Sequence, residues 1–460
     1  MEVRRIPASR YWQWAEAFGR YTEAALVAIA SPALVFPNRF TAYVLPLFPL
    51  LWLLRWKLTG RLTRRTPMDK PVLLLMLMLM VSLYPSIDLA SSMPKYLGVL
   101  LGIVLFYAVV NTVRTRGQAL ALGWMLLLLG GLIALAALLG TSWMGGKFGL
   151  DTLAQQLPRA FTSVEGSQRT LAGFHPNEVG GALVLFLPLS LALAAGNPRL
   201  RLAGVGLALL VSGTLLLTQS RSAFMGVGAG LLFLATVRWR RLVYAWAALP
   251  VAIALLLFTA GPDRLAGWLL PAQSQSAVGI WESRVEVWER AWYMVQDFPY
   301  TGVGLNTFPK VVDLLYPLFF APDASAVTHA HNFFLQTAVD LGVPGLLAFL
   351  WILGAFYLSL REAWRRHGND GQVRALAAGL AAGMLAHLVF GLTDAMTLGA
   401  KPGAALWLML GLGAALANLP RRPLTSPEKI SFCPGPGPGV RVRLQGTPEH
   451  DVGTARGART

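Results

Sequence analysis

The segment QALALGWMLLLLGGLIALAALLG, residues 118–140, contains no charged side chain and consists largely of leucine, alanine and glycine. A helix of about 20 apolar residues spans the hydrocarbon layer of a bilayer, which is about 30 Å thick. Similar runs recur along the 460 residues, of which 55% are hydrophobic and only 13% are charged. A soluble protein carries about 25% charged residues. The sequence therefore predicts an all-α polytopic membrane protein and excludes soluble enzyme folds.

Twelve apolar runs are recognisable on both sides of this segment, so we expect about 12 transmembrane helices. They are residues 22–36, 40–55, 71–90, 96–113, 118–140, 177–196, 202–218, 222–237, 242–260, 333–360, 373–392 and 402–419. We expect one membrane domain, residues 1–420, into which two longer loops, 141–176 and 261–332, are inserted. Residues 421–460 include PGPGPG and show no apolar periodicity, which predicts a disordered tail.

Basic residues are distributed unevenly over the connections between the runs. Alternate connections carry clusters, such as those at 238–241 and 361–374, whereas the opposite set carries scattered charges. Because Lys and Arg mark the connections that stay inside, we expect both termini to be cytoplasmic and loops 141–176 and 261–332 to face outward. The net charge of +17 therefore reflects topology, and membrane lipids, not nucleic acid, are the expected surroundings. The single Cys433 excludes a disulfide framework and a cysteine metal site.

Two arginines on the predicted outward side are candidates for anion binding. Arg221 lies in a short polar interruption between two apolar runs, where an ionisable group at the membrane boundary is a functional candidate. The alternative for Arg221 is a snorkelling interfacial anchor. Arg284 flanks the apolar stripe of a predicted surface helix. That stripe consists of Trp281, Val285, Trp288 and Trp292. The alternative for Arg284 is an ion pair with Glu282 or Glu286, and Arg290 is expected to pair with Glu286.

A His-x-His pair, His329 and His331, immediately precedes the apolar run at 333–360. Asn332 or Thr328 can cap that helix, which puts His331 near its N-terminus, where the helix dipole disfavours imidazolium. A neutral imidazole can accept a proton as a general base. The pair could instead bind a metal or serve as a structural cap. Since only Asp313 and Asp323 are close in sequence, we expect no metal site.

Further polar residues lie where other runs begin or end. Arg169 and Asn177 precede and enter the sixth run, and Asp394 lies at the outer end of the eleventh, where it could orient an arginine or cap a helix. No Asp-x-Asp occurs in the chain, so we expect no carboxylate-bound metal against donor phosphates. Arginine can neutralise the donor phosphates in place of a metal, because its planar fork pairs with two phosphate oxygens at once.

These residues together resemble bacterial O-antigen ligases. His331-Asn332, nine residues, and Gly342-Val343-Pro344-Gly345 match the His-Asn-x9-Gly-x-x-Gly signature of that family. The resemblance extends to Ser220-Arg221, to Arg284 and to the segment PYTGVG at 299–304. O-antigen polymerases and O-linked protein glycosyltransferases share the same elements.

The resemblance implies a membrane glycosyltransferase of the GT-C type with a large, partly helical periplasmic loop. It implies transfer of polysaccharide from undecaprenyl diphosphate to the lipid A–core of lipopolysaccharide at the periplasmic face of the bacterial inner membrane. The essential histidine of the family maps onto His331 and its two essential arginines onto Arg221 and Arg284. Arg169, Asn177, His329 and Asp394 are further substrate-binding candidates. The resemblance also implies that neither a metal nor another cofactor is needed.

The chemistry of these groups agrees with the resemblance. Lipid diphosphate leaves readily once its charge is neutralised, so two arginines suffice and no acid is required. A histidine within about 3 Å of the acceptor hydroxyl can take its proton. Attack opposite the diphosphate would invert the anomeric centre. A transporter of anionic lipid-linked sugars, which also needs outward arginines, is the alternative from a different class.

Overall fold

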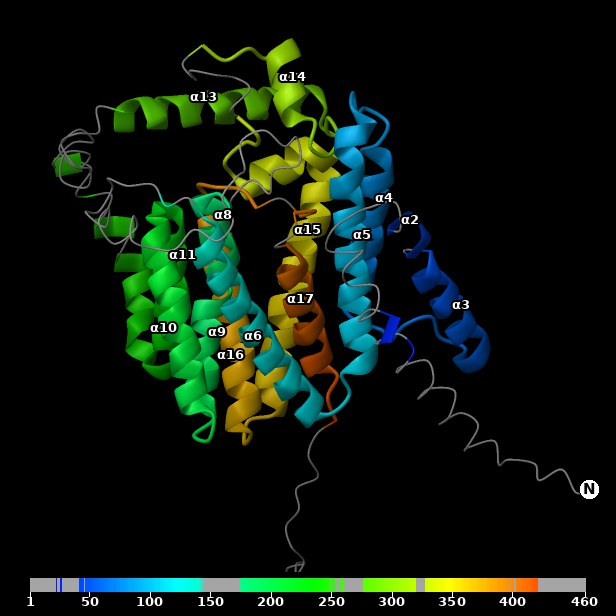
Figure 1. Cartoon of the computed structure of the whole chain (residues 1–460), viewed down its shortest axis with the longest axis vertical. Coiled ribbons are helices and arrows are strands. Elements are labelled where there is room, and N and C mark those ends of the chain that lie inside the picture. Colours follow the sequence, from blue (N-terminus) through cyan, green and yellow to red (C-terminus); the bar gives the residue numbers. More distant parts are fainter. Residues whose placement is uncertain are drawn as a thin grey trace, which may run out of the picture. The chain divides into compact units, whose positions relative to one another are not determined.

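The computed structural model of the chain is built from helices (Figure 1). It describes residues 41–44, 46–141, 143, 174–248, 276–319, 327–396, 398–400 and 403–420, with single positions in 22–26 and 250–259. Within these ranges there is no β-strand, and the single β-bridge joins Thr141 to Phe174. The predicted disordered tail, 421–460, and most of loop 141–176 lie outside the described residues.

Six described helical segments are long and apolar enough to cross a membrane. They are α5 (Leu89–Thr112), α6 (Arg116–Gly140), α8 with α9 (Pro176–Leu183 and Phe186–Gly196), α10 (Arg201–Thr218), α15 (Phe333–Arg366) and α16 (Gly371–Phe390). The apolar helix α17 (Gly403–Ala417) is shorter. These segments confirm a helical membrane protein, whereas the total of about 12 spans stays a prediction.

The predicted run 71–90 is divided in the structure. Helix α4 (Asp69–Val81) ends early, and α5 begins at Leu89 after a turn. Asp88 caps α5, because its Oδ1 accepts the N–H of Ser91 at 3.1 Å. The predicted run 40–55 comprises α2 (Thr41–Val44) and α3 (Leu47–Thr59). Most of run 22–36 and several positions of run 242–260 fall outside the described residues.

Helices α15, α16 and α17 contact one another and form the centre of the membrane domain. Helix α16 also packs against α9 and α11 (Arg221–Arg238), while α17 packs against α5 and α15 against α4. Small residues allow these close contacts. A Cβ on Gly102 of α5 would lie 2.1 Å from the indole of the fully buried Trp407 of α17. The core is therefore a close-packed helical bundle.

The amphipathic helix expected around Arg284 is α13 (Ser276–Asp297), which runs across the direction of the bundle helices (Figure 1). Its buried face packs on α14 (Phe308–Leu315) and α15 in a separate hydrophobic cluster. That face consists of Val287, Ala291, Met294 and Val295. Two residues of the predicted stripe, Val285 and Trp292, are 44% and 53% exposed. These two residues are thus available to another apolar surface, and the contact of the stripe with a membrane stays a prediction.

Helix α15 is broken at Gly342, where φ is 71° and ψ is 174°. The segment 299–304 fills the break: Val303 donates to the carbonyl of Val339 at 2.8 Å, and Val343 donates to that of Pro299 at 2.7 Å. A Cβ on Gly342 would lie 2.7 Å from the carbonyl of Tyr300. Only glycine tolerates both the positive φ and this contact. The two glycine-containing motifs, at 299–304 and 342–345, therefore contact each other and form one junction at the break in α15.

Candidate functional site

Two histidines and an aspartate gather where α15 begins and α16 has ended. Asp394 Oδ1 lies 3.6 Å from His331 Nδ1 and 3.9 Å from His329 Nε2. The imidazole centroids are 4.3 Å apart, and His329 Nδ1 accepts the backbone N–H of His331 at 3.1 Å. The side chain of Asp394 is only 5% exposed, against 28% for His331. The carboxylate thus lies behind the more accessible imidazole.

Backbone capping holds this cluster together. Asn332 is the N-cap of α15, as expected, and its Oδ1 accepts the N–H of Leu335 at 2.9 Å. The other end of the same amide donates to the carbonyl of Leu392 at 3.0 Å, and Phe333 donates to that of Gly391 at 2.7 Å. These bonds fasten the start of α15 to the turn that carries Asp394. His331 has a φ of 46°, a conformation that a surrounding structure must enforce.

A buried polar chain supports the histidines from inside the protein. The backbone N–H of Ala330, between the two histidines, donates to Gln336 Oε1 at 2.6 Å. Gln336 Nε2 then donates to Asp340 Oδ1 at 2.8 Å, and Asp340 also accepts the N–H of Asn306. Gln336 and Asp340 are both buried. The chain therefore links the His-x-His backbone to the junction at Gly342.

The cluster shapes the protonation of two of its members. Burial lowers the pKa of His329 to about 4, and the charges of His331, Lys95 and Arg284 add to the lowering. Burial by itself would raise the pKa of Asp394, but the contacts with His331 and His329 and the N–H of Ala395 outweigh it and lower that pKa. At neutral pH an uncharged His329 therefore faces an ionised Asp394.

The same three residues could hold a metal ion, because one ligand atom from each lies within 4.8 Å of the others. Two imidazoles and a carboxylate are ligands that Zn²⁺ and Fe²⁺ accept. In the described part of the chain, His331 Nδ1 and Asp394 Oδ2 are buried without a hydrogen-bond partner. The prediction of no metal site weighed only Asp313 and Asp323 as extra ligands. The structure adds Asp394, so the cluster can accept a proton or bind a cation.

Arg221 lies beside this cluster at the start of α11. Ser220 caps the helix by accepting the N–H of Ala223 at 3.4 Å, and the side chain of Arg221 is exposed. Thr393, next to Asp394, donates to Ser222 Oγ at 2.8 Å and joins the start of α11 to the aspartate turn. Within the described residues, the guanidinium of Arg221 makes no ion pair or hydrogen bond. It is available for an anion.

Arg284 lies on α13, and its charge contributes to the lowering of the pKa of His329. Glu286, one of the expected alternative partners, instead lies 3.8 Å from Arg290, as the i,i+4 spacing predicts. Glu286 also accepts the N–H of Phe319 at 2.6 Å. The carboxylate of Glu286 is therefore engaged by Arg290 and by the backbone of Phe319.

Lys95 is a site residue that sequence reasoning counted only as a topology charge. It lies in α5, and its charge acts on His329 and on Asp340. The available signal was a lysine at the edge of a long apolar run, 96–113, where a charged group is a functional candidate. Positive charge from α5 and α13 thus acts on the cluster.

The structure gives few contacts for Asn177 and does not describe Arg169. Asn177 lies in the first turn of α8, where its backbone N–H donates to His175 Nδ1 at 3.3 Å. A Cβ on Gly180 would lie 3.1 Å from Ala223, so the beginnings of α8 and α11 are in contact. Arg169 lies outside the described residues. The structure therefore brings His329, His331 and Asp394 together, with Arg221, Arg284 and Asn177 on adjoining elements.

The fold and this site define a helical membrane protein that contains a histidine–aspartate cluster, with cationic side chains on other helices. Residues 206–350 match the family model described as O-antigen ligase. The match supports membership of the O-antigen ligase/polymerase superfamily. It includes Arg221, Arg284, His329 and His331, whereas Asp394 lies beyond it. No curated protein matches the chain.

Proposed function

We propose that this protein is an O-antigen ligase that transfers polysaccharide from undecaprenyl diphosphate to lipid A–core at the periplasmic face of the bacterial inner membrane. The observation that carries the proposal is the contact of His331 with Asp394, 3.6 Å apart, in a chain whose residues 206–350 match the O-antigen ligase family. The proposal includes the GT-C type, about 12 spans and cytoplasmic termini, which the charge distribution supports.

His331 is the general base in this proposal, and Asp394 is the group that orients it. A carboxylate beside Nδ1 favours the tautomer with its proton there, which leaves Nε2 to accept the proton of the acceptor hydroxyl. The acceptor oxygen then bonds to the anomeric carbon as the bond from that carbon to the diphosphate oxygen breaks. The diphosphate leaves with the bonding electrons, and the anomeric centre inverts.

The arginines stabilise the leaving group. Arg221 and Arg284 belong to two different helices, α11 and α13, and are proposed to hold the diphosphate between them. Each guanidinium offers a planar fork to phosphate oxygens, and the charge that develops on the leaving oxygen is neutralised without a carboxylate-bound metal. His329, Asn177 and Arg169 are proposed to bind the remainder of the substrate.

Three other activities compete with this proposal. A polymerase would join two lipid-linked chains, and a protein glycosyltransferase would use serine or threonine of a protein. A transporter would move the lipid-linked sugar without forming a glycosidic bond. Acceptor choice depends on the shape of the cavity, so these activities are separated by product analysis.

The deciding experiment supplies purified protein with lipid-linked polysaccharide and one of three acceptors. These are lipid A–core, a second lipid-linked repeat and a pilin-like protein. We expect product with lipid A–core alone, and equal yield after treatment with EDTA. Product on another acceptor identifies the polymerase or the protein glycosyltransferase, and no product on any acceptor favours the transporter. Loss of turnover in EDTA, restored by Zn²⁺, would assign His329, His331 and Asp394 to a metal.

A further inference from the structure

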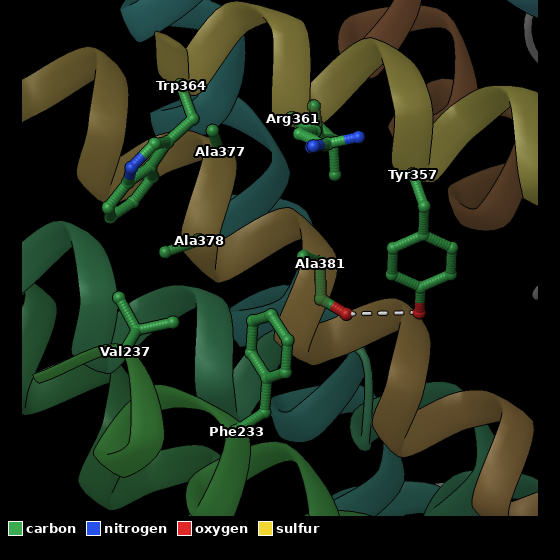
Figure 2. Close-up of a pocket in the computed structure, with 9 residues that line it drawn as sticks. Phe233, Val237, Tyr357, Arg361, Trp364, Ala377, Ala378 and Ala381 are labelled. Carbon is green, nitrogen blue, oxygen red and sulfur yellow. Dashed lines mark hydrogen bonds between the residues drawn. The ribbon is translucent and has the colours of Figure 1, made fainter. Parts of the chain in front are cut away.

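A concave apolar site separate from the histidine cluster lies between α11, α15 and α16 (Figure 2). Its volume is about 260 Å³. It is lined by the last turns of α11 and α15 and by the first turns of α16, where the basic residues Arg238, Arg365 and Arg366 also occur. From His331 to Arg361 the distance along α15 is on the order of 40 Å. The groove therefore cannot share a diphosphate with the histidine cluster.

The walls of this groove suit a hydrocarbon chain. Ala377, Ala378 and Ala381 of α16 form a shallow floor, because their side chains are small. Phe233 of α11 and Trp364 of α15 rise on either side. Tyr357, shown in Figure 2, uses its hydroxyl to donate to the carbonyl of Ala381 at 3.3 Å. The floor and walls thus offer contacts for methylene groups and little for a sugar.

The charged residue of the groove is Arg361, and its side chain is exposed. Two of the neighbouring arginines are paired, Arg366 with Glu362 and Arg116 with Asp370. Within the described residues, Arg361 has no such partner. Arg374 adds positive charge, since its guanidinium stacks 4.1 Å above the ring of Trp364. An apolar groove with an uncompensated guanidinium at its edge complements an anionic amphiphile.

We propose that this groove binds an anionic phospholipid of the bilayer. One acyl chain lies over Ala378 and Ala381, and the headgroup phosphate pairs with Arg361. Basic sites between transmembrane helices are suited to anionic headgroups. A zwitterionic lipid offers the same acyl contacts but brings its own positive charge to Arg361. The site is therefore selective for headgroup charge.

The test uses the full-length protein in lipid nanodiscs and the fluorescence of Trp364. The probes are phosphatidylglycerol and phosphatidylcholine with brominated acyl chains, each at low mole fraction. Subtracting the signal of Trp364→Phe isolates the quenching of this one tryptophan. We expect at least threefold stronger quenching by the anionic lipid than by the zwitterionic one. Equal quenching by both lipids overturns the proposal.

Three variants separate headgroup from acyl recognition. Arg361→Gln, at an exposed position, is expected to remove the preference for the anionic lipid, whereas Arg199→Gln, an exposed arginine between α9 and α10, keeps it. Ala378→Phe fills the groove and is expected to reduce quenching by both lipids. Its control is Leu209→Phe on α10, where Leu209 is 69% exposed. A preference that persists in Arg361→Gln overturns the assignment even if Ala378→Phe does not fold.

Discussion

The two ends of α15 differ in backbone geometry and in the burial of their polar side chains. At the N-terminal end the backbone departs from helical geometry at His331 and Gly342, and polar side chains such as Gln336 and Asp340 are buried. At the C-terminal end the helix is regular, and its polar groups are paired or exposed, as in the Arg366–Glu362 pair. Strained backbone and buried polar groups cost free energy and persist only where the surroundings enforce them. The N-terminal end carries the cluster that we assign to chemistry.

The difference also separates two kinds of binding. The N-terminal end presents a carboxylate, two imidazoles and nearby cations, which suit proton transfer and an anionic leaving group. The C-terminal end presents an apolar groove with Arg361 in its lining and Arg374 stacked on its wall, which suits a lipid that stays chemically unchanged. Helix α15 thus connects the cluster that we assign to chemistry with the groove that we assign to lipid binding.

The largest effect is expected from His331→Ala. If His331 is the base, its loss should lower kcat by about 10²–10⁴-fold, the contribution typical of a positioned proton acceptor. His367→Ala applies the same substitution at the C-terminal end of α15 and should leave turnover unchanged. The measurement is initial rate of polysaccharide transfer to lipid A–core. Near-normal transfer by His331→Ala, with loss of transfer in His329→Ala, would move the base to His329.

Gly342→Ala should destabilise the protein by about 2–5 kcal/mol, because the new Cβ adds strain at positive φ and a steric overlap. That Cβ would lie 2.7 Å from the carbonyl of Tyr300, so the segment 299–304 must move. We expect a lower midpoint of thermal unfolding and a loss of transfer activity together. An unchanged midpoint would show that the junction of 299–304 with α15 is adjustable.

Lowering the pH should reduce the stability of the fold, because burial disfavours the protonated form of His329 at the N-terminal end of α15. Its folded pKa of about 4 lies below the unfolded value of 6.5. Between these values the unfolded chain binds the proton and the folded chain does not, so stability is lost as pH falls from 6.5 to about 4, by at most about 3 kcal/mol. The lowered pKa of Asp394 acts below 3.8, outside this window. Unfolding midpoints measured from pH 7.5 to 4 should fall less steeply in His329→Gln, and parallel curves would contradict the assignment.

Features set by neighbouring residues could be predicted from the sequence, and features set by packing could not. Asn332 as a helix cap and the Glu286–Arg290 pair follow from local spacing, and the structure contains both. Asp394 approaches His331 only because α15 and α16 pack side by side, which no local pattern encodes. The turn at Asp88 was missed because a hydropathy window averages over a short interruption between α4 and α5.

Arg221→Lys tests the shape of a charge and not its presence. Lysine keeps the positive charge but lacks the planar fork that pairs with two phosphate oxygens. Diphosphate should therefore bind with one hydrogen bond fewer, and so with lower affinity. We expect about a tenfold loss in kcat/KM, equivalent to about 1.4 kcal/mol. Arg199→Lys, far along the chain from the histidine cluster, should retain full activity. Equal activity of both variants would show that Arg221 acts through charge alone or as an interfacial anchor.

The smallest expected effect has the opposite sign and comes from Gly354→Ala. Gly354 lies in α15 on the C-terminal side of the break, and a Cβ there would meet no atom within 4 Å. Alanine restricts the unfolded backbone and favours the helix, so the substitution should stabilise by about 0.5–1 kcal/mol without changing transfer activity. Both positions are glycines of one helix, so the contrast between Gly342→Ala and Gly354→Ala isolates backbone conformation and space. If both substitutions destabilise equally, the two ends of α15 are not built differently, and strain at Gly342 cannot mark a functional end.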